Sequence, residues 1–252
     1  MAAIYTDLAG KVVLVTGGAS GIGEAIVRRF ATQNSIVVFF DIKVEDGARL
    51  ARELTSDGLH AHFMKVDLTD ITGLRASIAD ARKAHGPINV LVNNAAHDER
   101  HRTEDMTPEY WDDRIAINLK HCFFAAQAVL PDMKAAKAGV IVNFSSISWI
   151  AGQGGMAAYT ASKSGMLGLT RSLARDYGPD NIRVNAVAPG WIMTQRQIEK
   201  WLTPEGEAEL MRRQCLKRKL VPDEIAKFVV FLASDEASAC TSQHYVVDGG
   251  WT

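Results

Sequence analysis

Two side chains on one expected helix, Tyr159 and Lys163, are spaced to act together as an acid–base pair. Residues four apart lie on the same helix face, one turn from each other. A free tyrosine titrates near pH ~10, and a lysine ammonium one turn away favours the phenolate and lowers that pKa. Ser146, which follows the apolar segment 140–144, supplies a hydroxyl that can hold the oxygen being deprotonated. This combination suits the oxidation of an alcohol or the reduction of a carbonyl.

The Tyr-x-x-x-Lys spacing alone is weak evidence, because it also arises by chance in helices. A glycine-rich turn near the start of the chain supports the interpretation. The continuous apolar segment 11–16 is typical of a parallel strand that is covered on both faces. Glycines follow at 17, 21 and 23, and a helical pattern begins among them. A strand, a glycine turn and a helix in this order bring backbone N–H groups and a helix N-terminus to a pyrophosphate. The turn therefore predicts a dinucleotide site.

Asp41 ends the second expected strand, 35–40, and bears on which dinucleotide is bound. A carboxylate about 20 residues beyond the glycine turn can accept hydrogen bonds from the adenosine ribose hydroxyls. The same charge repels a 2′-phosphate, and no basic residue stands at Ala19 or Ser20 within the turn. We therefore favour NAD over NADP, although Asp41 also fits the simpler role of a turn former.

Further apolar segments alternate with helical patterns, which predicts an α/β fold with a parallel sheet. The remaining expected strands are 61–66, 88–92, 140–144, 182–187 and 245–247. Asp67, at the end of the third strand, either contacts the adenine or begins a turn. The polar loop 97–102 follows the fourth strand, at the sheet edge where ligands bind in such folds. We expect this loop either to contact the substrate or to be solvated, and we expect no metal site at its histidines.

Two helical segments complete the expected site. A long helix over about 107–134 carries Asn118 in its interior, where asparagine is unfavourable and can bend the helix. A charged segment over about 191–219 follows the sixth strand and can cover the cofactor as a lid. An exposed pair of helices with mixed charges is the alternative for this segment.

Composition limits the functional classes. The chain has 252 residues, of which 47% are hydrophobic, and this suits one domain over 1–252. A net charge of −1 gives no general attraction to nucleic acid or to an anionic membrane. No apolar run approaches the ~20 residues of a membrane span, and the first residues do not resemble a secretory signal. Three widely spaced cysteines fit a reducing cytoplasm.

In combination, these motifs resemble the short-chain dehydrogenase/reductase family over essentially the whole chain. The shared motifs are Thr16-Gly17-x-x-x-Gly21-Ile22-Gly23, Asn93-Asn94-Ala95, Asn118, Ser146, Tyr159-x-x-x-Lys163 and Pro189-Gly190. The resemblance implies a Rossmann-type, doubly wound parallel sheet of seven strands in the order 3-2-1-4-5-6-7. It also implies a homotetramer. Ala96, where many members have glycine, is a small departure near the cofactor.

The resemblance also implies a role for each matching residue. Tyr159 is the general acid/base, Lys163 its partner that also binds the ribose, Ser146 the residue that orients the reacting oxygen, and Asn118 the holder of a proton-relay water. The implied cofactor contacts are Gly17, Ser20, Gly21, Ile22, Gly23, Asp41, Asp67, Leu68, Asn94, Ala95, Tyr159, Lys163, Pro189, Gly190, Ile192 and Thr194.

A narrower resemblance concerns the loops that meet substrate. Segments 98–101, 110–114, 144–149 and 201–208 look like those of bacterial D-xylose, L-arabinose and galactose 1-dehydrogenases. Aromatic faces and fixed polar groups suit a sugar, and the candidate substrate contacts are His97, Glu99, Ser146, Trp149, Gln153, Tyr159, Trp191 and Gln195. Either tryptophan could instead serve core packing.

The sequence thus predicts an NAD-dependent aldose 1-dehydrogenase that converts a cyclic sugar to an aldonolactone. Another alcohol or carbonyl substrate, such as a 3-ketoacyl thioester, is the first alternative. A catalytically silent dinucleotide sensor is the second, and the complete set of four catalytic residues argues against it.

Overall fold

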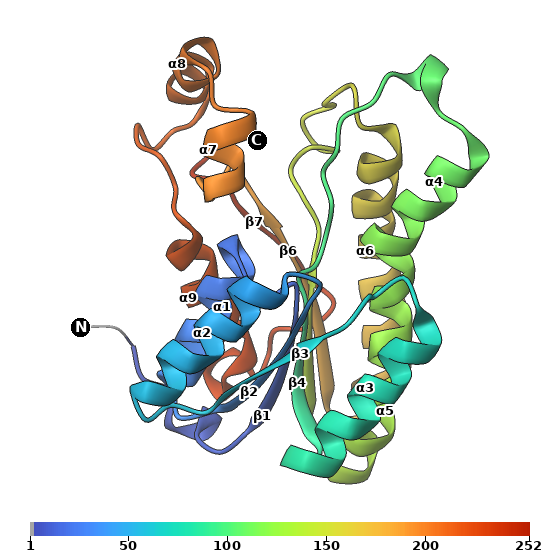
Figure 1. Cartoon of the computed structure of the whole chain (residues 1–252), viewed down its shortest axis with the longest axis vertical. Helices are drawn as coiled ribbons and strands as arrows, with labels where there is room; N and C mark the ends of the chain where they lie inside the picture. Colours follow the sequence, from blue (N-terminus) through green and yellow to red (C-terminus); the bar gives the residue numbers. More distant parts are fainter. Residues whose placement is uncertain (1–2) are drawn as a thin grey trace.

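A parallel sheet forms the centre of the computed structural model, which describes residues 3–252 (Figure 1). Its seven strands follow the order β3-β2-β1-β4-β5-β6-β7, as the sequence predicted. The strands are β1 Val12–Thr16, β2 Ile36–Asp41, β3 Ala61–Lys65, β4 Ile88–Asn93, β5 Gly139–Phe144, β6 Ile182–Pro189 and β7 His244–Val247. Every strand pair is parallel, so the carboxyl ends of all strands lie at one edge.

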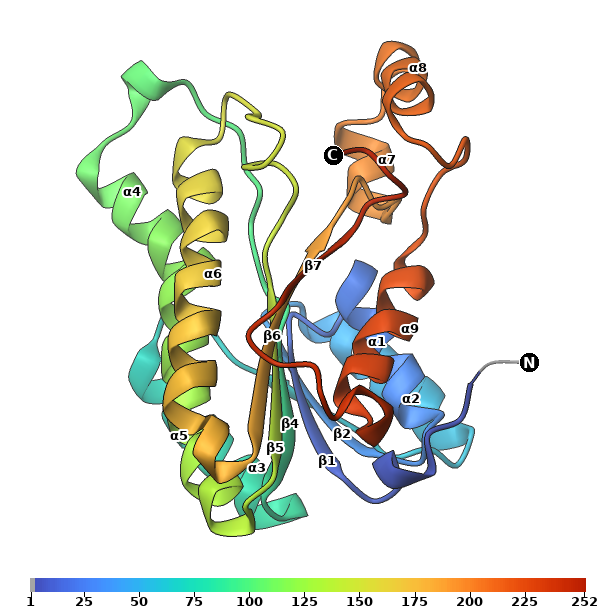
Figure 2. The ribbon, with the colours of Figure 1, turned by 180° about the vertical axis from the view of Figure 1, so that it is seen from behind.

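Helices cover both faces of the sheet, which explains why the inner strands are apolar without alternation. All five residues of β1 and all eight of β6 are buried. In Figures 1 and 2, α1, α2 and α9 lie on one face, and α3, α5 and α6 lie on the other. The helices are α1 Gly21–Ala31, α2 Val44–Ser56, α3 Ile71–His85, α4 Pro108–Ile115, α5 His121–Ala136, α6 Ala157–Tyr177, α7 Gln195–Lys200, α8 Pro204–Arg213 and α9 Pro222–Ala233.

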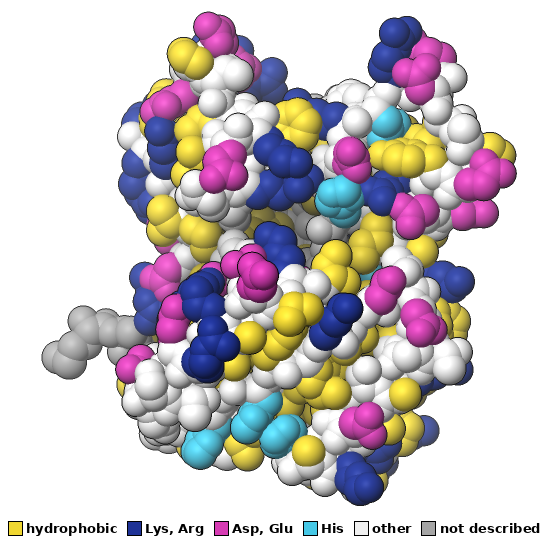
Figure 3. Space-filling view, viewed as in Figure 1, with side chains coloured by type: hydrophobic (Ala, Val, Ile, Leu, Met, Phe, Trp, Pro, Cys, Tyr) yellow, Lys and Arg dark blue, Asp and Glu magenta, His cyan; other side chains and the backbone are white. Residues whose placement is uncertain are grey.

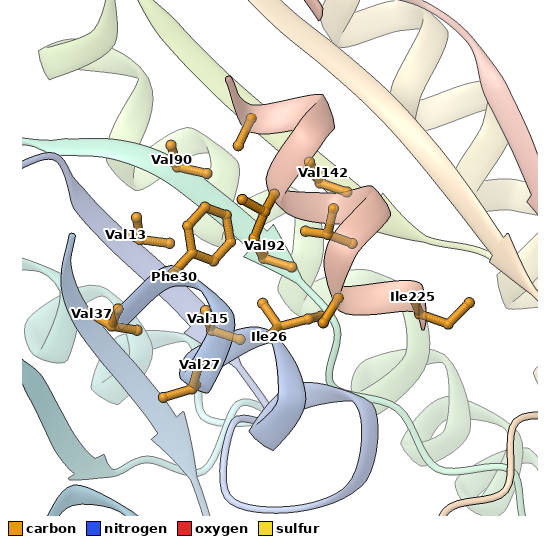
Figure 4. Packing of buried hydrophobic residues seen from close by; sticks show 14 of the residues in the cluster. Val13, Val15, Ile26, Val27, Phe30, Val37, Val90, Val92, Val142 and Ile225 are labelled. Carbon is orange, nitrogen blue, oxygen red and sulfur yellow. The ribbon is translucent and has the colours of Figure 1, made fainter. Parts of the chain in front are cut away.

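The core on the α1 face is built around Phe30 (Figure 4). Phe30 is fully buried, and it belongs to one apolar cluster with Val13 of β1 and Val37 of β2. Ile26 of α1 and Ile225 of α9 belong to the same cluster and are also fully buried. Burial of this apolar face fixes α1 on the sheet, and with it the glycine turn that begins α1.

The expected long helix over 107–134 is interrupted at Asn118. The chain forms α4, then one π-helical turn over Ala116–Lys120, and then α5. Asn118 is fully buried within the π turn. Pro131 lies inside α5, which continues to Ala136. π turns of this kind are frequent at functional sites.

The carboxyl edge of the sheet carries the loops and the short helices. In Figure 1 this edge faces upward, with α7 and α8 on one side and the loop that precedes α4 on the other. The C-terminus lies beside α7 in both views. The segment 191–219 therefore stands above the carboxyl edge and is helical over α7 and α8.

No helix within residues 3–252 combines the length and the apolar character that a membrane crossing requires.

Candidate active site

The glycine turn adopts a backbone that only glycine accommodates easily. Gly17 and Gly21 have φ angles of +67° and +59°, in the left-handed region. Gly23 has another reason for its identity, since a Cβ built there would lie 1.9 Å from the carbonyl oxygen of Gly17. These three positions let the backbone fold tightly onto the N-terminus of α1, where free N–H groups attract an anionic pyrophosphate.

Asp41 is fixed at the entrance to the turn. Its Oδ2 accepts a hydrogen bond from the backbone N–H of Ala19 at 3.0 Å, and its Oδ1 accepts one from the N–H of Lys43 at 3.0 Å. The ammonium of Lys43 lies 3.4 Å from Ser20 Oγ and 3.7 Å from an Asp46 oxygen. The structure therefore places a half-buried carboxylate, and a lysine already paired with another acid, beside the predicted adenosine site.

Thr16, at the end of β1, joins the turn to the end of β4. Its Oγ1 accepts hydrogen bonds from the backbone N–H groups of Asn94 at 3.1 Å and Ala95 at 3.2 Å. The side chain of Asn94 donates in return to the carbonyl oxygens of Thr16 and Gly17, both at 3.0 Å. The Asn-Asn-Ala segment is thereby held against the glycine turn. Thr16 appeared in the family motif, but its role as this joint was not predicted.

The other predicted cofactor contacts divide into two groups. Segment 189–194 faces the glycine turn, because a Cβ built at Gly21 would lie 3.1 Å from Thr194 Cγ2. Ile192 is buried and anchors this segment by pairing with Leu220. Asp67, in contrast, is exposed and accepts hydrogen bonds from the backbone and the hydroxyl of Thr69, the arrangement of a turn.

Lys163 is buried and held by the end of β5. Its Nζ donates to the carbonyl oxygen of Phe144 at 2.8 Å, the only acceptor of Nζ among residues 3–252. An ammonium carries three donors, so two remain for a ligand. The hydroxyl of Ser145 donates to the carbonyl oxygen of Lys163 at 2.7 Å. Ser146 contacts the hydroxyl of Tyr159 instead, through a side-chain hydrogen bond. Ser145 therefore bonds to the backbone of α6, and Ser146 bonds to the Tyr159 side chain.

The pKa of Tyr159 differs from the sequence expectation. It is raised to about 12, by burial first and by the charge of Asp98 second, while the hydrogen bond from Ser146 opposes the shift. Burial also lowers the pKa of Lys163 to about 8. The lowered pKa that the sequence predicted for Tyr159 is not found, because desolvation of the phenolate outweighs stabilisation by a neighbouring ammonium. Lys163 Nζ lies 5.7 Å from the centre of the Tyr159 ring.

Asn118 fixes the loop that follows β4. Its Oδ1 accepts a hydrogen bond from the N–H of His97 at 2.8 Å, and its Nδ2 donates to the carbonyl oxygens of His97 at 3.2 Å and Arg114 at 2.9 Å. The π turn is what brings the Asn118 side chain to this loop. The amide therefore acts here on backbone geometry, and its assignment to a relay water stays a prediction.

His121 was missed by the sequence reasoning. It is fully buried at the start of α5, directly after the π turn. Burial and the nearby charge of Lys163 lower its pKa to about 4, so this imidazole is neutral at physiological pH. A histidine inside an apolar helical pattern carries no signal that separates this position from ordinary packing.

The predicted substrate residues are not all available to a ligand. His97 and Glu99 lie together, with His97 Nδ1 3.5 Å from a Glu99 oxygen. The indole N–H of Trp149 donates to Ser145 Oγ at 3.1 Å, and that of Trp191 donates to Gln197 Oε1 at 2.9 Å. Gln153 and Gln195 are exposed, the latter donating to Glu199 at 2.6 Å. Both tryptophans therefore contribute ring surface rather than N–H donors.

These features meet at a hollow above the carboxyl edge. Figure 3 shows the molecule notched there, between the side that carries α7 and α8 and the side that carries α4. A strand–glycine turn–helix unit at the end of β1, together with Ser146 after β5 and with Tyr159 and Lys163 on α6, is typical of an oxidoreductase that uses a nicotinamide dinucleotide.

Comparison with known proteins places the chain within one family. Residues 17–252 match a family model described as Enoyl-(Acyl carrier protein) reductase. The chain belongs to the short-chain dehydrogenase/reductase family. It is 47% identical to D-xylose 1-dehydrogenase of Caulobacter vibrioides over 249 residues, which cover 99% of this chain and 98% of that protein.

Two further matches agree with this placement. The chain is 46% identical to a probable galactose dehydrogenase of Rhizobium meliloti, covering 98% of this chain and 96% of that protein. The crystal structure of gox2181 superposes with a TM-score of 0.92 at 33% identity and covers 98% of each chain. Family membership and fold therefore rest on sequence and structure together.

Replacing Thr16 by valine tests the joint between β1 and β4. The change removes the acceptor of two backbone N–H groups in a buried position, so we expect the free energy of unfolding to fall by ~1–3 kcal/mol in urea titrations. Thr55→Val is the matched control, since the Thr55 hydroxyl is exposed and bonds only within its own helix. A Thr16→Val protein as stable as the control would contradict the assignment.

Proposed function

We propose that this protein is an NAD-dependent aldose 1-dehydrogenase, which oxidises the anomeric carbon of a cyclic pentose or galactose-type sugar to an aldonolactone. The main support is the identity of 47% and 46%, over nearly the whole chain, to proteins named for xylose and galactose. The aromatic and polar side chains above the sheet edge agree with a sugar ligand.

The residues fit a bound dinucleotide. A Cβ at Gly23 would close the turn that must receive the pyrophosphate, and the buried ammonium of Lys163 retains donors for ribose hydroxyls. Asp41 would bind the adenosine ribose, and Thr194 would lie near the carboxamide end. When bound, the oxidised dinucleotide supplies the acceptor for the hydride that leaves C1, together with a positive charge that favours the Tyr159 phenolate.

Side chains of the protein carry out the proton transfer. Ser146 would bind the C1 oxygen and orient it toward Tyr159, with which it already shares a hydrogen bond. Tyr159, as phenolate, takes the proton of the C1 hydroxyl. Lys163 holds the ribose and stabilises the negative charge on Tyr159. Asn118 keeps the loop after β4 in place by bonding the backbone of His97.

Absorbance of reduced nicotinamide, followed with a panel of substrates, tests the proposal directly. The panel contains D-xylose, L-arabinose, D-galactose, D-glucose, L-fucose and L-rhamnose, with a secondary alcohol, a steroid and a 3-ketoacyl thioester as controls. We expect rapid NAD reduction with one or two aldoses. Activity confined to a control compound would remove the aldose assignment and leave the family assignment intact.

Tyr159→Phe tests the acid–base role. We expect turnover with the best aldose to fall by ~10²–10⁴-fold, because the proton acceptor is lost while the ring remains. Tyr177→Phe, near the other end of α6, should keep its activity.

Since a raised pKa keeps the Tyr159 phenol protonated at neutral pH, wild-type sugar oxidation should also accelerate as the pH rises through the alkaline range. A pH-independent rate, or an active Tyr159→Phe protein, would contradict this role.

Asp41→Asn tests the choice of dinucleotide. Placing a 2′-phosphate beside the Asp41 carboxylate costs several kcal/mol, so removing the charge should reduce the preference for NAD over NADP, measured as the ratio of kcat/KM values, by ~10²-fold. Asp46→Asn is the matched control, because Asp46 is a nearby but exposed acid on α2. An unchanged ratio in Asp41→Asn would show that this carboxylate does not select the cofactor.

A further inference from the structure

A pair of polar contacts connects the loop after β4 to α7 across the hollow. Asp98 Oδ1 lies 3.1 Å from Nη2 and 3.2 Å from Nε of Arg196, and Asp98 Oδ2 accepts a hydrogen bond from Gln197 Nε2 at 2.7 Å. Both oxygens of one carboxylate are therefore used by α7. The Asp98 side chain is 24% exposed, so this contact is partly shielded from water.

A second contact joins the same two segments. The guanidinium of Arg100 lies over the ring of Trp201, with Cζ 4.3 Å from the ring centre. Trp201 directly follows α7, and Arg100 lies two residues beyond Asp98. An ion pair and a cation–π contact thus connect the loop after β4 to α7 and the residue that follows it, although these segments are about a hundred residues apart in the chain.

Both ends of the Asp98 contact are held by residues of the active site. On one side, the neighbouring His97 is fixed through its backbone N–H and carbonyl by Asn118. On the other side, Gln197 accepts the indole N–H of Trp191 at 2.9 Å. The carboxylate therefore connects the buried π turn to the segment that leaves β6.

We propose that Asp98 is a positioning residue, which holds α7 over the bound sugar and cofactor. The inference extends the proposed aldose dehydrogenase function and rests on it. Hydrogen bonds to a charged group are stronger than those between neutral groups. A closed α7 retains substrate and excludes water, so Asp98 should act mainly on substrate affinity.

The charge of Asp98 gives its role a distinct signature. The groups that face Tyr159 are Lys163 on its own helix, Ser146 after β5 and Asp98 after β4. Of these, Asp98 is the negative charge, and a negative neighbour disfavours the phenolate. Arg196 pairs with the Asp98 carboxylate and partly offsets that charge. Removing Asp98 or Arg196 should therefore move the pH profile in opposite directions.

Kinetics of Asp98→Asn, Arg196→Gln and the double variant, measured on the best aldose, separate these effects. Each single variant should raise the KM for the sugar about tenfold. The KM of the double variant should be no higher than that of the more impaired single variant, because the same contact is lost in all three. The rising limb of kcat with pH should move to lower pH in Asp98→Asn and to higher pH in Arg196→Gln.

Asp105→Asn is the control, because Asp105 is an exposed acid near the same loop whose nearest cation is Arg102. It should leave both KM and the pH profile unchanged. Normal KM values in Asp98→Asn would overturn the proposal, and so would a KM effect in Asp98→Asn that is absent in Arg196→Gln.

Hydrogen exchange supplies a readout that needs no substrate. Backbone amides over 195–213 should exchange several-fold faster in Asp98→Asn and Arg196→Gln than in the wild type and in Asp105→Asn. This result would stand even if the wild-type protein oxidised no aldose, in which case the proposed function fails and the fastening of α7 holds. Unchanged exchange in both variants would show that α7 does not depend on Asp98.

Discussion

The parallel pairing of β1 with β4 is the constraint on which the rest of the site depends. It places Thr16 beside Asn93 in register, so the Thr16 hydroxyl can receive the two N–H groups that follow β4. The glycine turn and the Asn-Asn-Ala segment then form one continuous surface, here called the floor of the site. Because all strands run the same way, the ends of β5 and β6 add Ser146 and Thr194 to that floor without any long excursion of the chain.

Burial of ionisable groups determines the chemistry above this floor. Lys163 is 1% exposed and Tyr159 is half-buried, and desolvation moves both toward their neutral forms. At neutral pH the Tyr159 phenol therefore stays protonated. In the proposed function, the positive charge of an oxidised dinucleotide would favour the phenolate. His121, neutral and buried, adds no charge that would compete with Lys163.

The π turn and the loop after β4 connect the floor of the site to α7. The π turn turns Asn118 toward the loop after β4 and ties down His97, while Asp98 in the same loop reaches Arg196 and Gln197 of α7. At the base of α8, the N–H groups of Cys215 and Leu216 donate to the carbonyl oxygens of Gly250 and Gly249. The helices above the site are therefore held from the loop side through α7 and from the C-terminal segment beyond α8.

Local patterns in the sequence determined the strands, the glycine turn, the Tyr-Lys spacing and the carboxylate at the end of β2, because each depends on residues close together in the chain. The resemblance to the family also implied the strand order, which the structure confirms. Only the tertiary structure decided that the N–H groups of Trp149 and Trp191 are already bonded, and that Asp98 bridges to α7. These outcomes depend on side chains brought together from distant segments, and the pKa of Tyr159 depends on the burial that this packing creates.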